Sequence, residues 1–154
     1  MNIQWKKLIP CLLFPLAVGG LAGFLTRSSM SLFDAVQKPP LSPPGWLFPV
    51  VWTILYLLMG FASYLVLVSE TPGQTAWKLY VIQLIFNFFW PIFFFNLEQY
   101  LLSFVWLLLL WLFLLATILR FSRSSKLAGY LLIPYLLWVT FAGYLNLGIY
   151  FLNR

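Results

Sequence analysis

The sequence predicts an all-α integral membrane protein, a single domain in which a bundle of five helices crosses the bilayer. Two observations carry this prediction. Hydrophobic residues make up 63% of the 154 positions and charged residues only 8%, whereas soluble domains carry roughly 25% charged residues. The charges also delimit five long uncharged runs, each near or above the roughly 20 residues that cross a bilayer as a helix. These runs are rich in Leu and do not alternate as barrel strands do, so we expect helices.

The first span is predicted over residues 8–25. Lys6 and Lys7 precede it, as in a secretory signal, but the run is long for a signal and shows no clear small-residue cleavage site. We therefore expect a retained helix. Gly19 and Gly23 have the GxxxG spacing that lets a neighbouring helix approach closely, and we favour packing within the bundle over dimerisation as their role.

A loop over residues 27–45 follows, the longest in the chain. Its end reads KPPLSPPGW, with four prolines in seven positions. Because proline lacks an N–H group and restricts the residue before it, we expect extended, turn-rich backbone and no further helix before Gly45. Such a semi-rigid loop could act as a lid over one end of the bundle or serve as a stiff connector, and the sequence leaves both open.

The remaining four spans are predicted over residues 46–68, 77–96, 100–119 and 127–151. Only three residues separate the third span from the fourth, so these two helices are expected to be antiparallel neighbours. The fourth is nearly saturated with Leu and is expected to face lipid over much of its surface.

Basic residues in the short loops predict the orientation. Six lie on the side of the N-terminus and three on the opposite side, which favours a cytoplasmic N-terminus because positive loops stay in the cytoplasm. We assign the net charge of +6 to this topology and to anionic lipid, and we expect no nucleic-acid partner because the basic residues do not cluster. The first side carries Lys6, Lys7, Lys78, Arg120, Arg123 and Lys126, and the opposite side carries Arg27, Lys38 and Arg154.

Missing residue types argue against several functions. The chain has no histidine and a single cysteine, Cys11, so we expect neither an internal disulfide nor a metal site. The uncharged cores of the spans hold no Asp, Glu, Lys, Arg or His, which disfavours ion-coupled transport. The sequence also shows no nucleophile–base pair, paired carboxylates or phosphate loop, so conventional acid–base or nucleophilic catalysis is disfavoured.

Three of the predicted helices each carry a face that mixes aromatic with neutral hydrogen-bonding side chains. Because polar groups are costly against lipid, we expect these faces to turn inward. They consist of Trp52, Tyr56, Met59 and Ser63 in 46–68, of Gln83, Asn87, Trp90 and Phe94 in 77–96, and of Tyr135, Trp138, Ala142 and Asn146 in 127–151.

Such an interior suits a large, flat, mostly apolar ligand, because rings stack on it while indole and amide groups fix its orientation. The same residues also fit ordinary helix packing with polar groups as glue, and the residues alone leave both interpretations open. On the ligand interpretation the predicted binding residues are Trp52, Tyr56, Gln83, Asn87, Trp90, Phe94, Tyr135, Trp138, Ala142 and Asn146.

Three stretches resemble, in order and spacing, the signatures of the TspO/translocator protein family, also called the peripheral-type benzodiazepine receptor family. They are WLFPVVWTILYLLMG (46–60), FNFFWPIFFF (86–95) and YLLIPYLLWVTFAGYLN (130–146). The resemblance implies a five-helix bundle, usually a homodimer, with a pocket near one membrane face closed by the loop between the first two helices. It implies porphyrins, notably protoporphyrin IX and haem, and benzodiazepine-site compounds as ligands, and in some members a sterol.

Carried over by motif, the resemblance implies a pocket lined by Trp52, Tyr56, Asn87, Trp90, Trp138 and Ala142. It implies a role in tetrapyrrole sensing, regulation or transport, with porphyrin as ligand and no required cofactor. Without histidine, haem iron would lack its usual axial ligands, so metal-free porphyrin or weakly ligated haem is expected. An alternative is light- and oxygen-dependent degradation of protoporphyrin IX, for which Trp52 and Trp138 would be the catalytic residues.

Three further expectations concern the surroundings. The short N-terminus without a transit peptide favours the plasma membrane of a bacterium. A sterol-like pattern formed by Leu147, Tyr150 and Arg154 is better explained as an interfacial anchor. Relatives often have a basic residue or proline in the turn after the third helix, where this chain has Leu97-Glu98-Gln99-Tyr100, and the third helix lacks the small residues used for dimer contact in some relatives. The sequence therefore does not indicate which helix would form a dimer interface.

Overall fold

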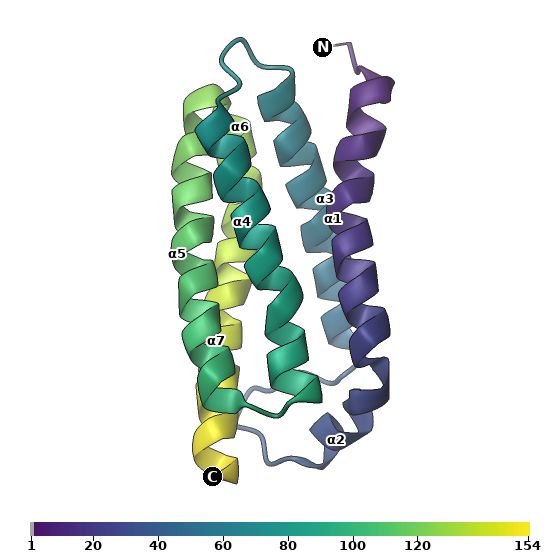
Figure 1. The fold of residues 1–154 in the computed structure, drawn as a ribbon, viewed down its shortest axis with the longest axis vertical. Coiled ribbons are helices and arrows are strands. Elements are labelled where there is room, and N and C mark those ends of the chain that lie inside the picture. Colours follow the sequence, from purple (N-terminus) through teal and green to yellow (C-terminus); the bar gives the residue numbers. More distant parts are fainter. Residues whose placement is uncertain (1) are drawn as a thin grey trace.

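The computed structural model describes residues 2–154, and every regular element in that range is a helix. Five helical segments are long and apolar enough to cross a membrane. They stand side by side in one elongated bundle, with the N-terminus and the C-terminus at opposite ends (Figure 1). The predicted all-α, five-span membrane architecture is confirmed.

The helical segments follow the predicted spans, with differences mainly at their ends. The first and third spans begin three residues earlier, at Trp5 and Gln74. The fourth span continues past residue 119 to Ser124, and the fifth is divided at Leu132 because Pro134 lies in the first turn of its second part and has no N–H to continue the preceding helix. In chain order the elements are α1 (Trp5–Thr26), the 3-10 turn η1 (Arg27–Ser29), α2 (Met30–Ala35), α3 (Leu47–Leu67), α4 (Gln74–Pro91), the π-helical turn η2 (Ile92–Asn96), α5 (Tyr100–Ser124), α6 (Lys126–Leu131) and α7 (Ile133–Asn153).

The long helices close into a ring that does not follow the chain order. α1 packs against α3 on one side and α4 on the other, α5 packs against α4 and α7, and α3 packs against α6. α7 therefore lies between α3 and α5, while α1 completes the ring between α3 and α4. Near α2 the buried core includes a cluster of aromatic rings, among them Phe33, Phe94 and Phe95.

Close approach of α1 to α3 depends on glycine. A Cβ added at Gly60 of α3 would lie 2.6 Å from the backbone oxygen of Cys11, and one added at Gly19 of α1 would overlap the ring of Tyr56. Gly23, the second residue of the GxxxG pair, has open space beside it instead. Within the described chain, close helix packing therefore uses Gly19 but not Gly23.

The loop over residues 27–45 is only partly extended, in contrast to the prediction. Its first half forms η1 and α2, because the prolines begin at Pro39 and restrict only the second half. Phe33 holds α2 under the bundle. Its ring is buried and packs against Phe95 and Phe48, with centroid separations of 5.2 and 5.9 Å.

The second half of the loop is attached to α7. The Gln37 backbone N–H donates to Asn153 Oδ1 at 3.0 Å, and Asn153 Nδ2 donates back to the Gln37 carbonyl at 2.7 Å. The Tyr144 hydroxyl donates to the Pro40 carbonyl at 2.7 Å. The loop therefore covers the α2 end of the bundle and is fixed on the α7 side.

Candidate ligand-binding site

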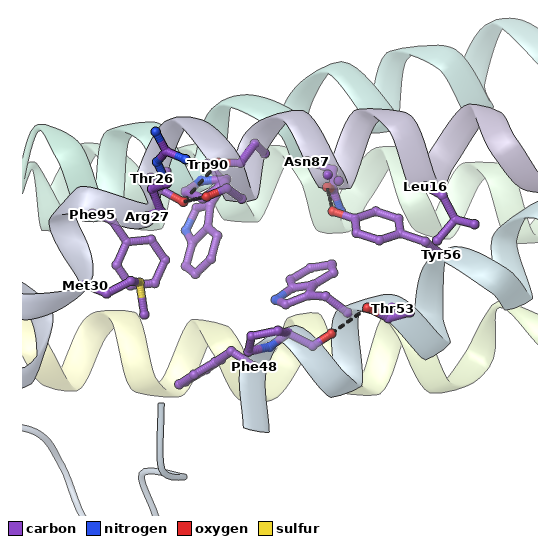
Figure 2. Close-up of a pocket in the computed structure, with 17 residues that line it drawn as sticks. Leu16, Thr26, Arg27, Met30, Phe48, Thr53, Tyr56, Asn87, Trp90 and Phe95 are labelled. Carbon is purple, nitrogen blue, oxygen red and sulfur yellow. Dashed lines mark hydrogen bonds between the residues drawn. The ribbon is translucent and has the colours of Figure 1, made fainter. Parts of the chain in front are cut away.

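A cavity of about 460 Å³ lies between α1, α3 and α4, in the half of the bundle nearest α2 (Figure 2). Its volume falls within the range of roughly 300–1,000 Å³ that is typical of small-molecule sites. Its lining is mostly apolar, with rings from α3 and α4 facing a wall of small side chains from α1. The rings belong to Phe48, Trp52 and Tyr56 of α3 and to Trp90 and Phe95 of α4 and η2.

The α1 wall owes its shape to small residues. Gly19, Gly20, Ala22 and Gly23 all line the cavity, and an added Cβ at Gly20 or Gly23 would meet no atom within 4 Å. Side chains at these two exposed positions would extend into open space at the edge of the cavity. The glycines of α1 therefore leave this edge of the cavity open.

The aromatic wall is held by ring-on-ring packing. Trp52 stacks on Tyr56 with a centroid separation of 5.6 Å and an interplanar angle of 28°, and it meets Tyr135 edge-on at 6.0 Å. Trp90 stacks on Phe94 at 5.0 Å and 23°. Offset stacking and edge contacts are the favoured geometries of aromatic pairs, so both indoles are fixed before any ligand arrives.

A buried hydrogen-bond chain joins the cavity wall to the centre of the bundle. The Tyr56 hydroxyl donates to Asn87 Oδ1 at 2.6 Å, and Asn87 Nδ2 donates to the Tyr135 hydroxyl at 2.7 Å. Tyr135 in turn donates to Gln83 Oε1 at 2.7 Å. All four side chains are buried, so the chain connects α3, α4 and α7 and sets the orientation of Tyr56.

The Trp90 indole is fixed by a second set of bonds. Its Nε1 donates to Asn146 Oδ1 at 3.0 Å, and Asn146 Nδ2 donates to the Tyr100 carbonyl at 2.7 Å. The indole N–H is therefore already used within the protein, and what Trp90 offers a ligand is the apolar surface of its ring.

The cavity opens sideways between α1 and α3. Of its lining residues, Gly20 and Gly23 on α1 and Pro49 and Thr53 on α3 are exposed at the surface of the bundle. On the other flank of α1, Asn96 connects η2 to the end of α1, because its Nδ2 donates to the Leu25 carbonyl at 3.0 Å. The opening thus lies on the side of the bundle, where lipid surrounds a membrane protein.

The structure separates the ten residues predicted to bind ligand into several groups. Four line the cavity, two lie behind it in the hydrogen-bond chain, and three line a small void of about 10 Å³ beyond Trp90. The last, Trp138, packs edge-on against Phe48 at 5.9 Å and is not part of the cavity lining. The four are Trp52, Tyr56, Asn87 and Trp90, the two are Gln83 and Tyr135, and the three are Phe94, Ala142 and Asn146.

The third helix that lines the cavity is therefore α1, whereas the sequence predicted the helix of residues 127–151 in that role. The α7 face does turn inward, but Tyr135 and Asn146 bind to α4 across the bundle and leave α7 outside the cavity lining. The contribution of α1 was missed because Gly19 and Gly23 were assigned to close packing. The cluster of small residues was the available signal, since small residues leave space as readily as they permit contact.

The side chains on the lining determine which ligand chemistry the cavity can accommodate. Within residues 2–154 no group of three or more His, Cys, Asp or Glu side chains is arranged to hold a metal ion. The side chains on the lining that carry polar groups are three with hydroxyls, two indoles, one amide and one guanidinium. They belong to Thr26, Thr53, Tyr56, Trp52, Trp90, Asn87 and Arg27.

Comparison with known proteins adds an independent observation. The profile of the TspO/MBR family matches residues 11–152, nearly the whole chain. The tryptophan-rich protein TspO of Chlorobaculum tepidum is 42% identical, and the alignment covers 99% of each chain. The tryptophan-rich sensory protein of Cereibacter sphaeroides is 37% identical over 95% of this chain and 90% of its own.

Similarity extends to an animal protein. The translocator protein of Homo sapiens is 37% identical over 90% of this chain and 86% of its own length. The matches therefore include all five spans and the loop that carries α2.

Proposed function

The chain belongs to the TspO/MBR family of integral membrane proteins, and from this premise we propose that it binds porphyrins such as protoporphyrin IX, and similar flat lipophilic molecules, in the cavity between α1, α3 and α4. The observation that carries the proposal is a cavity of about 460 Å³ with the fixed rings of Trp52 and Trp90 on its wall. Flat conjugated ligands gain both apolar burial and stacking from such rings.

The biological role that we propose is tetrapyrrole sensing, regulation or transport. Relatives bear the names tryptophan-rich sensory protein and translocator protein, and these names support a role in sensing or movement of a ligand for this chain. The ligand would bind without a resident cofactor, because the lining supplies stacking surface and hydrogen bonds directly.

Fluorescence tests the proposal. Titration of the purified protein in lipid nanodiscs with protoporphyrin IX should quench tryptophan emission saturably. Trp52→Phe and Trp90→Phe should each weaken binding, by about tenfold if the indole contributes roughly 1–1.5 kcal/mol beyond the smaller ring. Trp111→Phe is the matched control, because Trp111 lies on α5 with its Nε1 bonded to Thr140 and is not part of the lining. Quenching that rises linearly with porphyrin and never saturates would count against a site.

A second candidate function is light- and oxygen-dependent degradation of protoporphyrin IX. The observation in its favour is that the Trp52 indole lies on the cavity wall, where a bound porphyrin excited by light would contact it. Illumination of the complex in air should then bleach the porphyrin band faster than in empty nanodiscs, and Trp52→Phe should slow the loss more than Trp138→Phe, because Trp138 lies behind Phe48. Equal bleaching with and without protein would reject this function.

We further propose that the N-terminus is cytoplasmic, in the plasma membrane of a bacterium, and that the protein forms a homodimer surrounded by lipid. The six-to-three distribution of basic residues supports the orientation, which would place α2 and the cavity in the outer half of the bilayer. The pattern of Leu147, Tyr150 and Arg154 is assigned to anchoring at that face rather than to sterol binding, since Arg154 lies at the exposed end of the chain, 5.1 Å from the Phe151 ring.

A further inference from the structure

Arg27 is the one charged residue, among residues 2–154, that lines the cavity. It follows directly after α1, and its guanidinium lies 4.0 Å above the exposed ring of Phe24. None of the three acidic residues of the chain lines the cavity. A cationic side chain therefore lies at one end of an otherwise uncharged cavity, and no acidic residue lines the cavity with it.

The position of Arg27 along the cavity is informative. Figure 2 shows Arg27 at the end where Met30, Trp90 and Phe95 lie, away from Leu16 and Tyr56 at the other end. The end with Arg27 is also the end nearest α2, because Arg27 directly follows Thr26, the last residue of α1. The cavity thus has a cation at this end and only uncharged groups at the other, among them Leu16, Tyr56 and Asn87, and this arrangement suits an amphipathic ligand.

We propose that Arg27 binds an anionic group of the cavity ligand, so that the site selects flat apolar molecules that carry a carboxylate at one edge. This inference rests on the proposed function, and it assigns the carboxylates of a porphyrin to the Arg27 end and its rings to the indoles. A guanidinium suits this task because its planar donors bind a carboxylate bidentately.

Arg27 could also have a simpler role that does not involve the ligand, and the experiment must distinguish this role from carboxylate binding. A cation at the C-terminal end of a helix is favoured by the helix dipole, and a long basic side chain at a span end extends to the polar interface. A role of that kind would be independent of the ligand. Ligand binding makes the opposite prediction, since the effect of Arg27 must depend on whether the ligand carries a charge.

The experiment compares protoporphyrin IX with its dimethyl ester, which has the same ring system and no carboxylate. Affinities for both are measured by tryptophan quenching in phosphatidylcholine nanodiscs, for the wild type, Arg27→Gln, Arg27→Lys and Arg154→Gln. Arg154 is the matched control, because it is the same residue type at the same end of the bundle and does not line the cavity. Each comparison is made between variants with one ligand, so different partition of the two porphyrins into lipid cancels.

The expected result is a loss of affinity for the acid of about tenfold in Arg27→Gln, as for a charge-assisted bond at a partly hydrated site. The ester should bind all variants equally, Arg27→Lys should lose less than Arg27→Gln, and Arg154→Gln should bind both ligands like the wild type. Unchanged acid affinity in Arg27→Gln, or an equal loss for acid and ester, would overturn the proposal while the cavity remained a binding site. Absence of saturable binding in the wild type would overturn the proposed function itself.

A lipid phosphate shares the anionic chemistry and provides the last arm of the test. The same titrations in nanodiscs that contain phosphatidylglycerol should keep the loss of acid affinity in Arg27→Gln relative to the wild type, because a carboxylate tethered to a bound ring system has a high local concentration at Arg27. Disappearance of that difference between the two variants would reassign Arg27 to the lipid head group and overturn the proposal.

Discussion

The two ends of the α1–α3 pair use small residues in opposite ways. Toward the N-terminal end of the bundle, Gly60 of α3 lies against the α1 backbone, so that a Cβ would sit 2.6 Å from the Cys11 oxygen and 2.7 Å from Leu12 Cα. Toward the α2 end, Gly20 and Gly23 of α1 have empty space beside them. One helix pair is therefore tightly packed at one end and encloses a cavity at the other.

The partner across the gap decides between the two outcomes. A glycine that faces backbone permits contact, whereas the glycines near the α2 end share the cavity with large, fixed rings such as Trp52 and Trp90. The tight end also contains side chains with no exposed surface, among them Met59, Tyr80 and Phe121. Atoms that line a void lose dispersion contacts, so we expect the tight end to supply most of the stability and the α2 end to supply the binding.

The largest predicted effect is on the stability of the tight end. Gly60→Ala should lower the stability of the bundle by about 1–3 kcal/mol, the usual cost of overpacking, because the atoms that its Cβ meets belong largely to the α1 backbone and cannot move aside. Gly20→Ala, with no atom within 4 Å of the new Cβ, is the control and should leave stability unchanged or slightly raised. Thermal unfolding in detergent measures both, and equal effects of the two substitutions would remove the distinction between the ends.

Filling the cavity should have the opposite effect to Gly60→Ala, because it should lower ligand affinity and leave stability nearly unchanged. Gly23→Leu places a branched side chain into the space beside α1, so porphyrin affinity should fall by about tenfold, while the unfolding temperature changes little. Fluorescence titration gives the affinity and thermal unfolding gives the stability. A Gly23→Leu variant that is strongly destabilised would show that this side of α1 is packed in the membrane, contrary to the structure.

The buried tyrosines offer a smaller and matched test of the hydrogen-bond chain. Tyr56 donates to Asn87, whereas the Tyr80 hydroxyl is buried and makes no hydrogen bond of good geometry within residues 2–154, since its neighbour Ser63 donates to the Gly60 carbonyl instead. Tyr56→Phe should therefore cost about 0.6 kcal/mol, and at most about 1.7, the range measured for side-chain bonds within membranes. Tyr80→Phe should be neutral or stabilising, because it removes an unsatisfied polar group. Chemical unfolding of both variants in mixed micelles makes the comparison, and a larger loss for Tyr80→Phe would contradict it.

The architecture and the inward faces could be predicted because both follow from the cost of polar groups in lipid. Charge spacing predicted the five spans, and the stripes of Gln83, Asn87, Tyr135 and Asn146 lie inside the bundle, where they bond to one another or to neighbouring indoles and hydroxyls. These are local rules that a sequence obeys residue by residue.

The position of the cavity could not be predicted in the same way, because it depends on which helices are neighbours. α1 closes the ring between α3 and α4, and no periodicity within α1 indicates that placement. Trp138 packs against Phe48 and does not itself line the cavity. This position likewise depends on the relative rotation of α3 and α7. The ring of Phe33 in α2 packs against that of Phe95. This is a tertiary contact, which the local sequence pattern does not indicate.

The smallest predicted effect concerns the loop that covers the cavity end. Tyr144→Phe removes the bond to the Pro40 carbonyl, and since Tyr144 is exposed this bond is worth the low end of about 0.5–1.5 kcal/mol. Limited proteolysis within residues 36–46 should accelerate about two- to threefold, while Tyr130→Phe, an exposed tyrosine on α6, should change nothing. No acceleration would mean that the Gln37–Asn153 pair alone holds the loop. Faster cleavage with an unchanged rate of porphyrin binding would indicate that ligand enters through the side opening between α1 and α3, because a route beneath the loop would become faster as the loop loosened.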